Sequence, residues 1–221
     1  MLITYISQYL KINLKYLLSD TGKNALGLKQ TFGFQETFTE IDVFLEREVD
    51  AYVVISSSDT IYSVSKKLFK NGKPILLEKP PGFSSKETWE LHEISKKNNT
   101  YGMVALNRRY YSDFQHGLAL LADYGPIRGA VLEVPESITK AKQEQELREL
   151  EYENYFIRNS IHAFDFLRHV MGEVKKIKSM GSLNSENENR GLSAGAVLEH
   201  EGNKFSIIST LWDVKPSFWR I

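Results

Sequence analysis

Short apolar runs alternate, along the first half of the chain, with segments in which apolar residues recur every three or four positions. The short runs predict strands, which we place at 12–18, 51–55, 75–77 and 101–106. The segments with helical spacing predict helices, which begin near Ala25, Ile41, Ile61 and Ser85. A regular alternation of strand and helix predicts a parallel sheet with right-handed crossovers.

Local signals set the limits of several elements. Ser84 and Glu87 have the spacing of a capping box, which predicts a helix over 85–97. Gly33 follows a helical stripe and is a predicted helix stop. The run 51–55 is apolar throughout, which is typical of a strand buried on both faces of a parallel sheet.

The pattern changes after residue 107. Helices are predicted around 114–121 and over 161–171, where the second begins near His162. Strands are predicted at 127–134, 174–180, 194–199 and 205–211. The charged stretch 140–153 is either an exposed helix or a mobile loop, and 182–190 is a polar turn. The second half therefore reads as α+β with an open, mainly antiparallel sheet.

Composition excludes some classes of function. Lys and Arg number 28, as do Asp and Glu, so the net charge is zero and nothing favours nucleic acid or a membrane surface. The chain has no Cys, which excludes disulfides and thiolate chemistry, and the sequence shows no metal-ligand cluster. No apolar run has the length of a membrane span, and the first ten residues do not resemble a signal peptide, so we expect a cytoplasmic protein.

Polar residues stand at the carboxyl ends of the predicted strands, where ligands bind in an open α/β sheet. They are Asp20, Ser56-Ser57-Ser58, Glu78-Lys79-Pro80 and Asn107-Arg108-Arg109-Tyr110. Asp20 is either an acid that accepts hydrogen bonds from the ribose of a dinucleotide and disfavours a 2′-phosphate, or a turn residue that caps the next helix.

Two of the polar residues suit proton transfer. Lys79 precedes a proline, which favours extended backbone and directs the lysine into the expected cleft, and a lowered pKa there would suit proton transfer. The alternative is a solvated lysine at a strand exit. His162 is either an acid/base that Asp165 orients from one turn away or a structural histidine.

Several motifs together resemble the Gfo/Idh/MocA oxidoreductases. They are the strand 50–55, the helix end Asn71-Gly72-Lys73, the run Ile75-Leu76-Leu77-Glu78-Lys79-Pro80, the segment Asn107-Arg108-Arg109-Tyr110, the turn Gly125-Pro126-Ile127, and the helix segment 159–167 with Gly172-Glu173-Val174. The resemblance covers roughly 12–211, and the order and spacing of the motifs make it specific.

The resemblance implies a fold, a reaction and a set of site residues. It implies a partial NAD(P)-binding Rossmann-like domain over 1–106 and a partial α+β substrate and oligomerisation domain over 107–221, which builds a homo-oligomer through its sheet. It implies hydride transfer between NAD(P) and a sugar or polyol hydroxyl, with Lys79 and His162 as catalytic residues. Cofactor-binding residues would be Asp20, Ser56, Ser57, Glu78, Lys79, Pro80, Asn107 and Arg108; substrate-binding residues would be Tyr110, Arg158, Asn159 and His162. Asp20 favours NAD over NADP.

The sequence also departs from the family pattern. The family opens with a strand and a glycine-rich turn that approaches the pyrophosphate, whereas 1–10 resembles only the helix after that turn. We therefore expect the neighbours of the central strand to be unpaired, and the 221 residues to bind NAD poorly or not at all. Arg158 stands where many members carry an Asp, so it would either lower the proton affinity of His162 or bind an anionic substrate group. Many family members carry a Pro and a His after the third strand, and Ser57 and Ile61 stand near those two positions here.

Two hypotheses follow. The first is an N- and C-terminally truncated part of an NAD(P)-dependent sugar or polyol dehydrogenase, inactive in this shortened form. The second is a non-catalytic relative that binds a sugar or nucleotide-sugar or serves as a partner subunit, and it is motivated by Arg158, Ser57 and Ile61.

Overall fold

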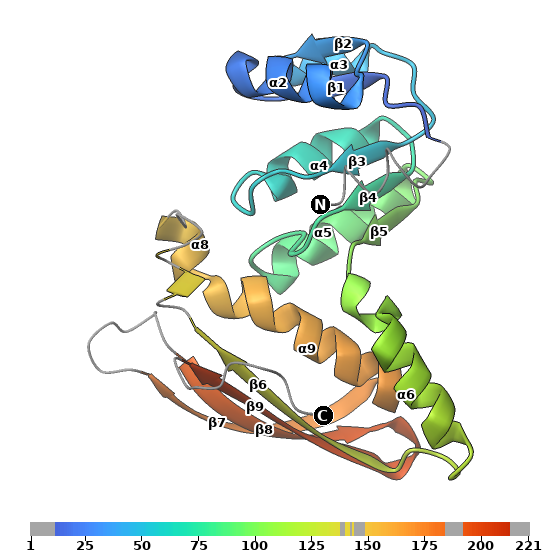
Figure 1. The fold of residues 1–221 in the computed structure, drawn as a ribbon, viewed down its shortest axis with the longest axis vertical. Helices are drawn as coiled ribbons and strands as arrows, with labels where there is room; N and C mark the ends of the chain where they lie inside the picture. Colours follow the sequence, from blue (N-terminus) through green and yellow to red (C-terminus); the bar gives the residue numbers. More distant parts are fainter. Residues whose placement is uncertain (1–11, 138–139, 142, 144–148, 184–191, 213–221) are drawn as a thin grey trace.

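The computed structural model describes residues 12–137, 140, 141, 143, 149–183 and 192–212 (Figure 1). The predictions for 1–10 and for 184–190 of the polar turn lie outside these residues. So does much of the charged stretch 140–153, although its end, α8 (Glu149–Glu153), is helical. None of the described helices is long and apolar enough to cross a membrane.

The first half alternates strands and helices, as predicted. The strands are β1 (Tyr16–Leu18), β2 (Glu36–Phe38), β3 (Tyr52–Val54), β4 (Ile75–Leu77) and β5 (Gly102–Val104). The helices between them are α2 (Gly22–Phe32), α3 (Ile41–Leu45), α4 (Ile61–Lys70) and α5 (Ser85–Lys97). All strand pairs are parallel. The short strand β2 was not predicted, because three residues carry too little periodicity.

The parallel strands fall into two sheets. One sheet pairs β1 with β2, the other has the order β3-β4-β5, and no pairing joins β1 to β3 among the described residues. Figure 1 shows the two groups of strands separated at this point. The expectation that the strands on either side of this point are unpaired is therefore confirmed for the described residues.

The local signals of the first half are confirmed. The Ser84 side chain accepts from the backbone of Glu87, whose carboxylate accepts from the backbone of Ser84, so α5 begins with a complete capping box. Gly33 ends α2 in the left-handed conformation, with φ of 74°, which glycine adopts without strain.

One packing prediction is wrong. Tyr52 and Val54 are buried, but Val53 is 43% exposed and Ile55 is 50% exposed, so β3 is buried on one face only. The reason is that α4 and α5 pack side by side and cover the same face of the sheet, with Leu68 and Leu91 in its core.

The second half is built on one four-stranded sheet. Its strands are β6 (Gly129–Glu136), β7 (Val174–Leu183), β8 (Leu192–His200) and β9 (Lys204–Trp212), in the order β6-β9-β8-β7. The β8 pairings are antiparallel and β6 runs parallel to β9, so the sheet is mainly antiparallel, as predicted. Between the halves lie the 3-10 helix η1 (Asn107–Tyr110) and α6 (Ser112–Ala122).

The long helix α9 (Tyr155–Met171) lies across one face of this sheet (Figure 1). Phe166, Leu167 and Met171 pack there against Leu132 and Ile208 in a second core, separate from that of the first half. A division into domains at residue 106 stays a prediction, which these two cores support.

The start of α9 corrects another prediction. The helix begins at Tyr155, six residues before the expected start at Ile161. Tyr155 is buried and packs with Ala141 and Tyr152, so tertiary packing extends the helix through the polar pair Asn159-Ser160. His162 therefore lies in the middle of the helix, between Arg158 and Asp165 on successive turns.

Candidate functional site

Lys79 leaves the end of β4 and reaches α9. The backbone N–H of Glu78 donates to the Val54 carbonyl at 2.9 Å, so the sheet pairing extends just beyond β4. The Lys79–Pro80 peptide is cis, and Pro80 is fully buried. The Lys79 ammonium then donates a 2.9 Å hydrogen bond to the backbone carbonyl of Arg158. The interpretation of Lys79 as a merely solvated lysine is therefore wrong.

Burial and neighbouring cations destabilise the charged form of Lys79. They lower its pKa to about 8, with burial as the main cause, followed by the charge of Arg158. Arg108 acts in the same sense, while the carboxylates of Glu78 and Glu136 oppose it. An amine with this pKa exchanges its proton near neutral pH, which is the property that proton transfer requires.

His162 is buried in the same region, with 5% of its surface exposed. Burial, together with the charges of Lys79 and Arg108, lowers the pKa of His162 to about 3, so its imidazole is neutral at physiological pH. Its Nδ1 atom is buried and has no hydrogen-bond partner within the described part of the chain. The buried nitrogen of a neutral imidazole can donate or accept a hydrogen bond, so it can bind a polar group of a ligand.

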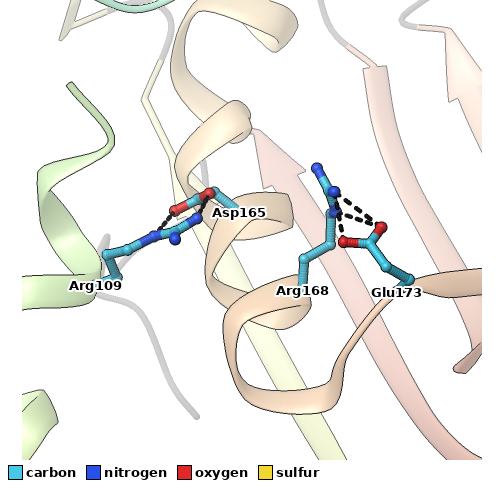
Figure 2. Close-up of polar contacts among 4 residues, drawn as sticks. All are labelled: Arg109, Asp165, Arg168 and Glu173. Atoms are coloured by element: carbon cyan, nitrogen blue, oxygen red, sulfur yellow. Dashed lines mark hydrogen bonds and ion pairs between the residues drawn. The ribbon is translucent and has the colours of Figure 1, made fainter. Parts of the chain in front are cut away.

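Asp165 does not orient His162, contrary to the prediction. Its carboxylate instead binds the guanidinium of Arg109 through two contacts, Nε to Oδ2 at 2.9 Å and a terminal nitrogen to Oδ1. Figure 2 shows this two-pronged pair between η1 and α9. The sequence placed Asp165 one turn from His162, but it gave no sign that a residue 56 positions earlier holds its carboxylate.

Arg158 also differs from its prediction. Its charge acts on Lys79, whereas the cations that lower the pKa of His162 are Lys79 and Arg108. The Nε atom of Arg158 lies 3.7 Å from the Glu151 carboxylate on α8, and both side chains are largely buried. Sequence reasoning missed Glu151, because it lies in a charged stretch that resembles a solvated surface.

The other predicted residues occupy three settings. Ser56 is half-buried, and its hydroxyl has no hydrogen-bond partner among the described residues, while the Ser57 hydroxyl lies 2.9 Å from that of Thr60. Asn107 and Tyr110 are exposed on η1, and Asn159 is half-buried on α9. Asp20 is exposed just past the end of β1, in the other parallel sheet, and Thr21 rather than Asp20 is the N-cap of α2. The capping interpretation of Asp20 is therefore wrong.

The described residues fit one side of a dinucleotide. Lys79, the buried Ser56 hydroxyl and the buried His162 Nδ1 are hydrogen-bonding groups suited to hydroxyl-rich ligands. The 221 residues contain no G-x-G-x-x-G run, so we assign no residues to the pyrophosphate. No cluster of metal-ligating side chains occurs in the part of the chain that the structure describes.

Comparison with known proteins identifies the class and then the family. Residues 5–106 match the family described as "Oxidoreductase family, NAD-binding Rossmann fold", so the first half is an NAD-binding Rossmann fold. The family matched over these residues is Gfo/Idh/MocA, the family that the motifs resemble. No curated protein sequence matches it.

Solved structures share the fold at low sequence identity. A probable dehydrogenase from Thermotoga maritima aligns with a TM-score of 0.75 and 19% identity over 95% of this chain and 65% of its own. A putative myo-inositol dehydrogenase from Sinorhizobium meliloti aligns with a TM-score of 0.78 and 18% identity, over 96% of this chain and 65% of its own. The WlbA dehydrogenase from Chromobacterium violaceum, solved with NADH and UDP-GlcNAcA, aligns with a TM-score of 0.80 and 12% identity, over 97% of this chain and 64% of its own. The chain thus spans less than two thirds of the length of each of these proteins.

Proposed function

We propose that the chain is part of an NAD(P)-dependent oxidoreductase that oxidises or reduces a hydroxyl-bearing carbon of a sugar, sugar derivative or polyol. The observation that carries the proposal is that Lys79, just after β4, and His162 on α9, 83 residues apart, lie close enough for the Lys79 charge to act on His162, and that both pKa values are lowered. Two groups tuned in this way at the end of a Rossmann sheet suit the chemistry of an alcohol.

The roles of the two residues follow from their charge states. Lys79, with a pKa of about 8, is partly neutral at neutral pH, so it can take the hydroxyl proton during oxidation and return it during reduction. His162 is neutral and buried, so it orients the same hydroxyl by a hydrogen bond. When bound, the nicotinamide supplies the hydride acceptor or donor.

Further contacts are proposed for the predicted residues. Ser56, Ser57, Glu78, Pro80, Asn107 and Arg108 would line the cofactor. Asp20 would accept hydrogen bonds from the adenosine ribose and repel a 2′-phosphate, which favours NAD over NADP. Tyr110, Arg158 and Asn159 would contact the substrate.

We also propose that the second sheet associates with another copy of the chain. The face away from α9 exposes apolar side chains on neighbouring strands, including Val131, Val197, Phe205 and Ile207 at 39% to 54%. Apolar faces of this kind are typical of homo-oligomer interfaces. A monomeric mass in solution for the whole protein would contradict this proposal.

The test compares two lysines in the whole protein. Lys79→Ala is expected to abolish reduction of NAD with sugar or polyol substrates, whereas Lys70→Ala, an exposed lysine at the end of α4, leaves turnover near the wild-type rate. Production of NADH is followed by its absorbance. Normal turnover by the Lys79 variant would refute the role of Lys79.

A second candidate function is a non-catalytic sugar-binding relative. The Arg158–Glu151 pair favours it, because it places a cation where many relatives carry an acid next to the catalytic histidine. Calorimetry separates the two functions. Saturable sugar binding without binding of NADH would favour the non-catalytic relative, and NAD reduction by the whole protein would exclude it.

A further inference from the structure

The ion pair between Arg109 and Asp165 joins two segments that carry the candidate site. Arg109 lies on η1, directly after β5, and Asp165 lies on α9, one turn after His162. Both prongs of the guanidinium contact the carboxylate, and the Asp165 carboxylate raises the pKa of Arg109. Two parallel contacts fix direction as well as distance, which a single contact does not.

Burial distinguishes this pair from an ordinary surface pair. The Asp165 side chain is 7% exposed and that of Arg109 is 29% exposed. On the same helix, Arg168 makes a similar two-pronged pair with Glu173, but those side chains are 55% and 62% exposed (Figure 2). The helix therefore offers a matched comparison between a buried and a solvated pair of the same chemistry.

The buried pair affects the candidate site through Arg108, the residue next to Arg109. Arg108 is a cation whose charge acts on both Lys79 and His162. It shares the short η1 with Arg109, so the backbone position of Arg108 depends on where Arg109 is held. A 3-10 helix of four residues has little stability of its own, and its position must come from contacts with neighbouring elements.

We propose that Arg109 and Asp165 are positioning residues of the candidate site, whose ion pair holds η1, and with it Arg108, against the turn of α9 that carries His162. The inference rests on the proposed function only for the role of His162. The pair itself touches neither Lys79 nor His162 through any contact described above, so it acts through the segment that it holds.

The direction in which the pKa of His162 changes distinguishes a positioning role of the ion pair from a direct effect of the Asp165 charge. The charges that act on His162 are those of Lys79 at the end of β4 and Arg108 on η1, and its own helix carries Arg158 and Asp165. The carboxylates of Glu78 and Glu136 and the guanidinium of Arg158 act on Lys79. Loss of the Asp165 negative charge, acting alone, lowers the proton affinity of a neighbouring histidine. Release of Arg108 raises it, because a nearby cation moves away.

The experiment is an NMR titration of the His162 ring in the intact chain, with Asp165→Asn and, as the control, Glu173→Gln. Asp165→Asn is expected to raise the pKa of His162 by about one pH unit and to speed amide exchange across 107–110. Glu173→Gln is expected to change neither the pKa of His162 nor the amide exchange across 107–110. Arg109→Lys, which keeps the charge but loses the two-pronged contact, is expected to shift His162 in the same direction by less.

Each outcome bears on the proposal. An unchanged or lowered His162 pKa in folded Asp165→Asn would overturn it. If that variant does not fold, Arg109→Lys decides, and an unchanged titration there would overturn it equally. The readouts need no cofactor or turnover, so a failed dehydrogenase assay and a failed positioning test are separate results.

Discussion

The Lys79 ammonium donates a 2.9 Å hydrogen bond to the backbone carbonyl of Arg158, and this contact ties the end of β4 to the first turn of α9. The acceptor is a main-chain atom, so it survives replacement of the Arg158 side chain. Charge and hydrogen bonding at Lys79 can therefore be separated by substitution.

Arg158→Gln is expected to raise the pKa of Lys79 from about 8 towards the ordinary lysine value, because the substitution removes the neighbouring cation and keeps the carbonyl acceptor. NMR of selectively labelled lysine side chains measures this titration. Arg168→Gln, which removes an exposed cation about three turns further on, is the control and should leave Lys79 unchanged. A Lys79 that titrates identically in both variants would contradict the assignment of Arg158 as its neighbouring cation.

Acid should destabilise the protein through His162. Its pKa is about 3 when folded and about 6.5 in an unfolded chain, so the unfolded state binds more protons between these values. The contribution to stability is complete above pH 6.5 and falls as the pH drops towards 3. Protonation of this residue alone should lower the free energy of unfolding by about 3 kcal/mol between pH 7 and pH 4.

Urea unfolding at the two pH values tests this expectation. His162→Gln should lose less stability on acidification than the wild type, because glutamine does not titrate. The exposed His116 serves as control, and His116→Gln should keep the wild-type dependence. Equal losses in the wild type and His162→Gln would show that His162 is not buried in its neutral form.

The two ion pairs of α9 should differ in their contribution to stability. Asp165→Asn leaves a partly buried guanidinium without its carboxylate and should lower the free energy of unfolding by about 2–3 kcal/mol. Glu173→Gln breaks a solvated pair and should leave the melting temperature near the wild-type value. Thermal unfolding of the two variants compares them directly, and an equal effect would contradict the burial of the Arg109 pair.

Gly102 should be intolerant of a side chain. A Cβ built there lies 2.6 Å from the ring of Phe69, which is buried on α4 and cannot move aside. Gly102→Ala should therefore cost about 1–3 kcal/mol through overpacking. Gly117 in α6 has open space around its Cα, so Gly117→Ala should stabilise the helix by about 0.5–1 kcal/mol. Denaturant unfolding should give effects of opposite sign.

Local chemistry made much of the fold predictable from sequence. The Ser84 and Glu87 spacing gave α5 its limits, because capping depends on residues within one turn. The start of α9 was missed, because Tyr155 is buried against Ala141, which precedes it by 14 positions and lies outside the helix. For the same reason the sequence indicated Lys79 and His162 as candidates but assigned Asp165 to the wrong partner: no spacing rule links η1 to α9.

The gap in hydrogen bonding between β1 and β3 has a consequence for local unfolding. Within the described chain, side chains connect the two groups of strands: Phe44 packs on Tyr52, Lys67 bonds Asp42, and Asn71 donates to the Leu45 carbonyl. A group of elements joined to its neighbour by side chains alone opens at a lower free energy than one joined by a continuous backbone ladder. The segment from β1 to α3 should thus form a subglobal cooperative unit, whose amides exchange while those of β4 are still protected.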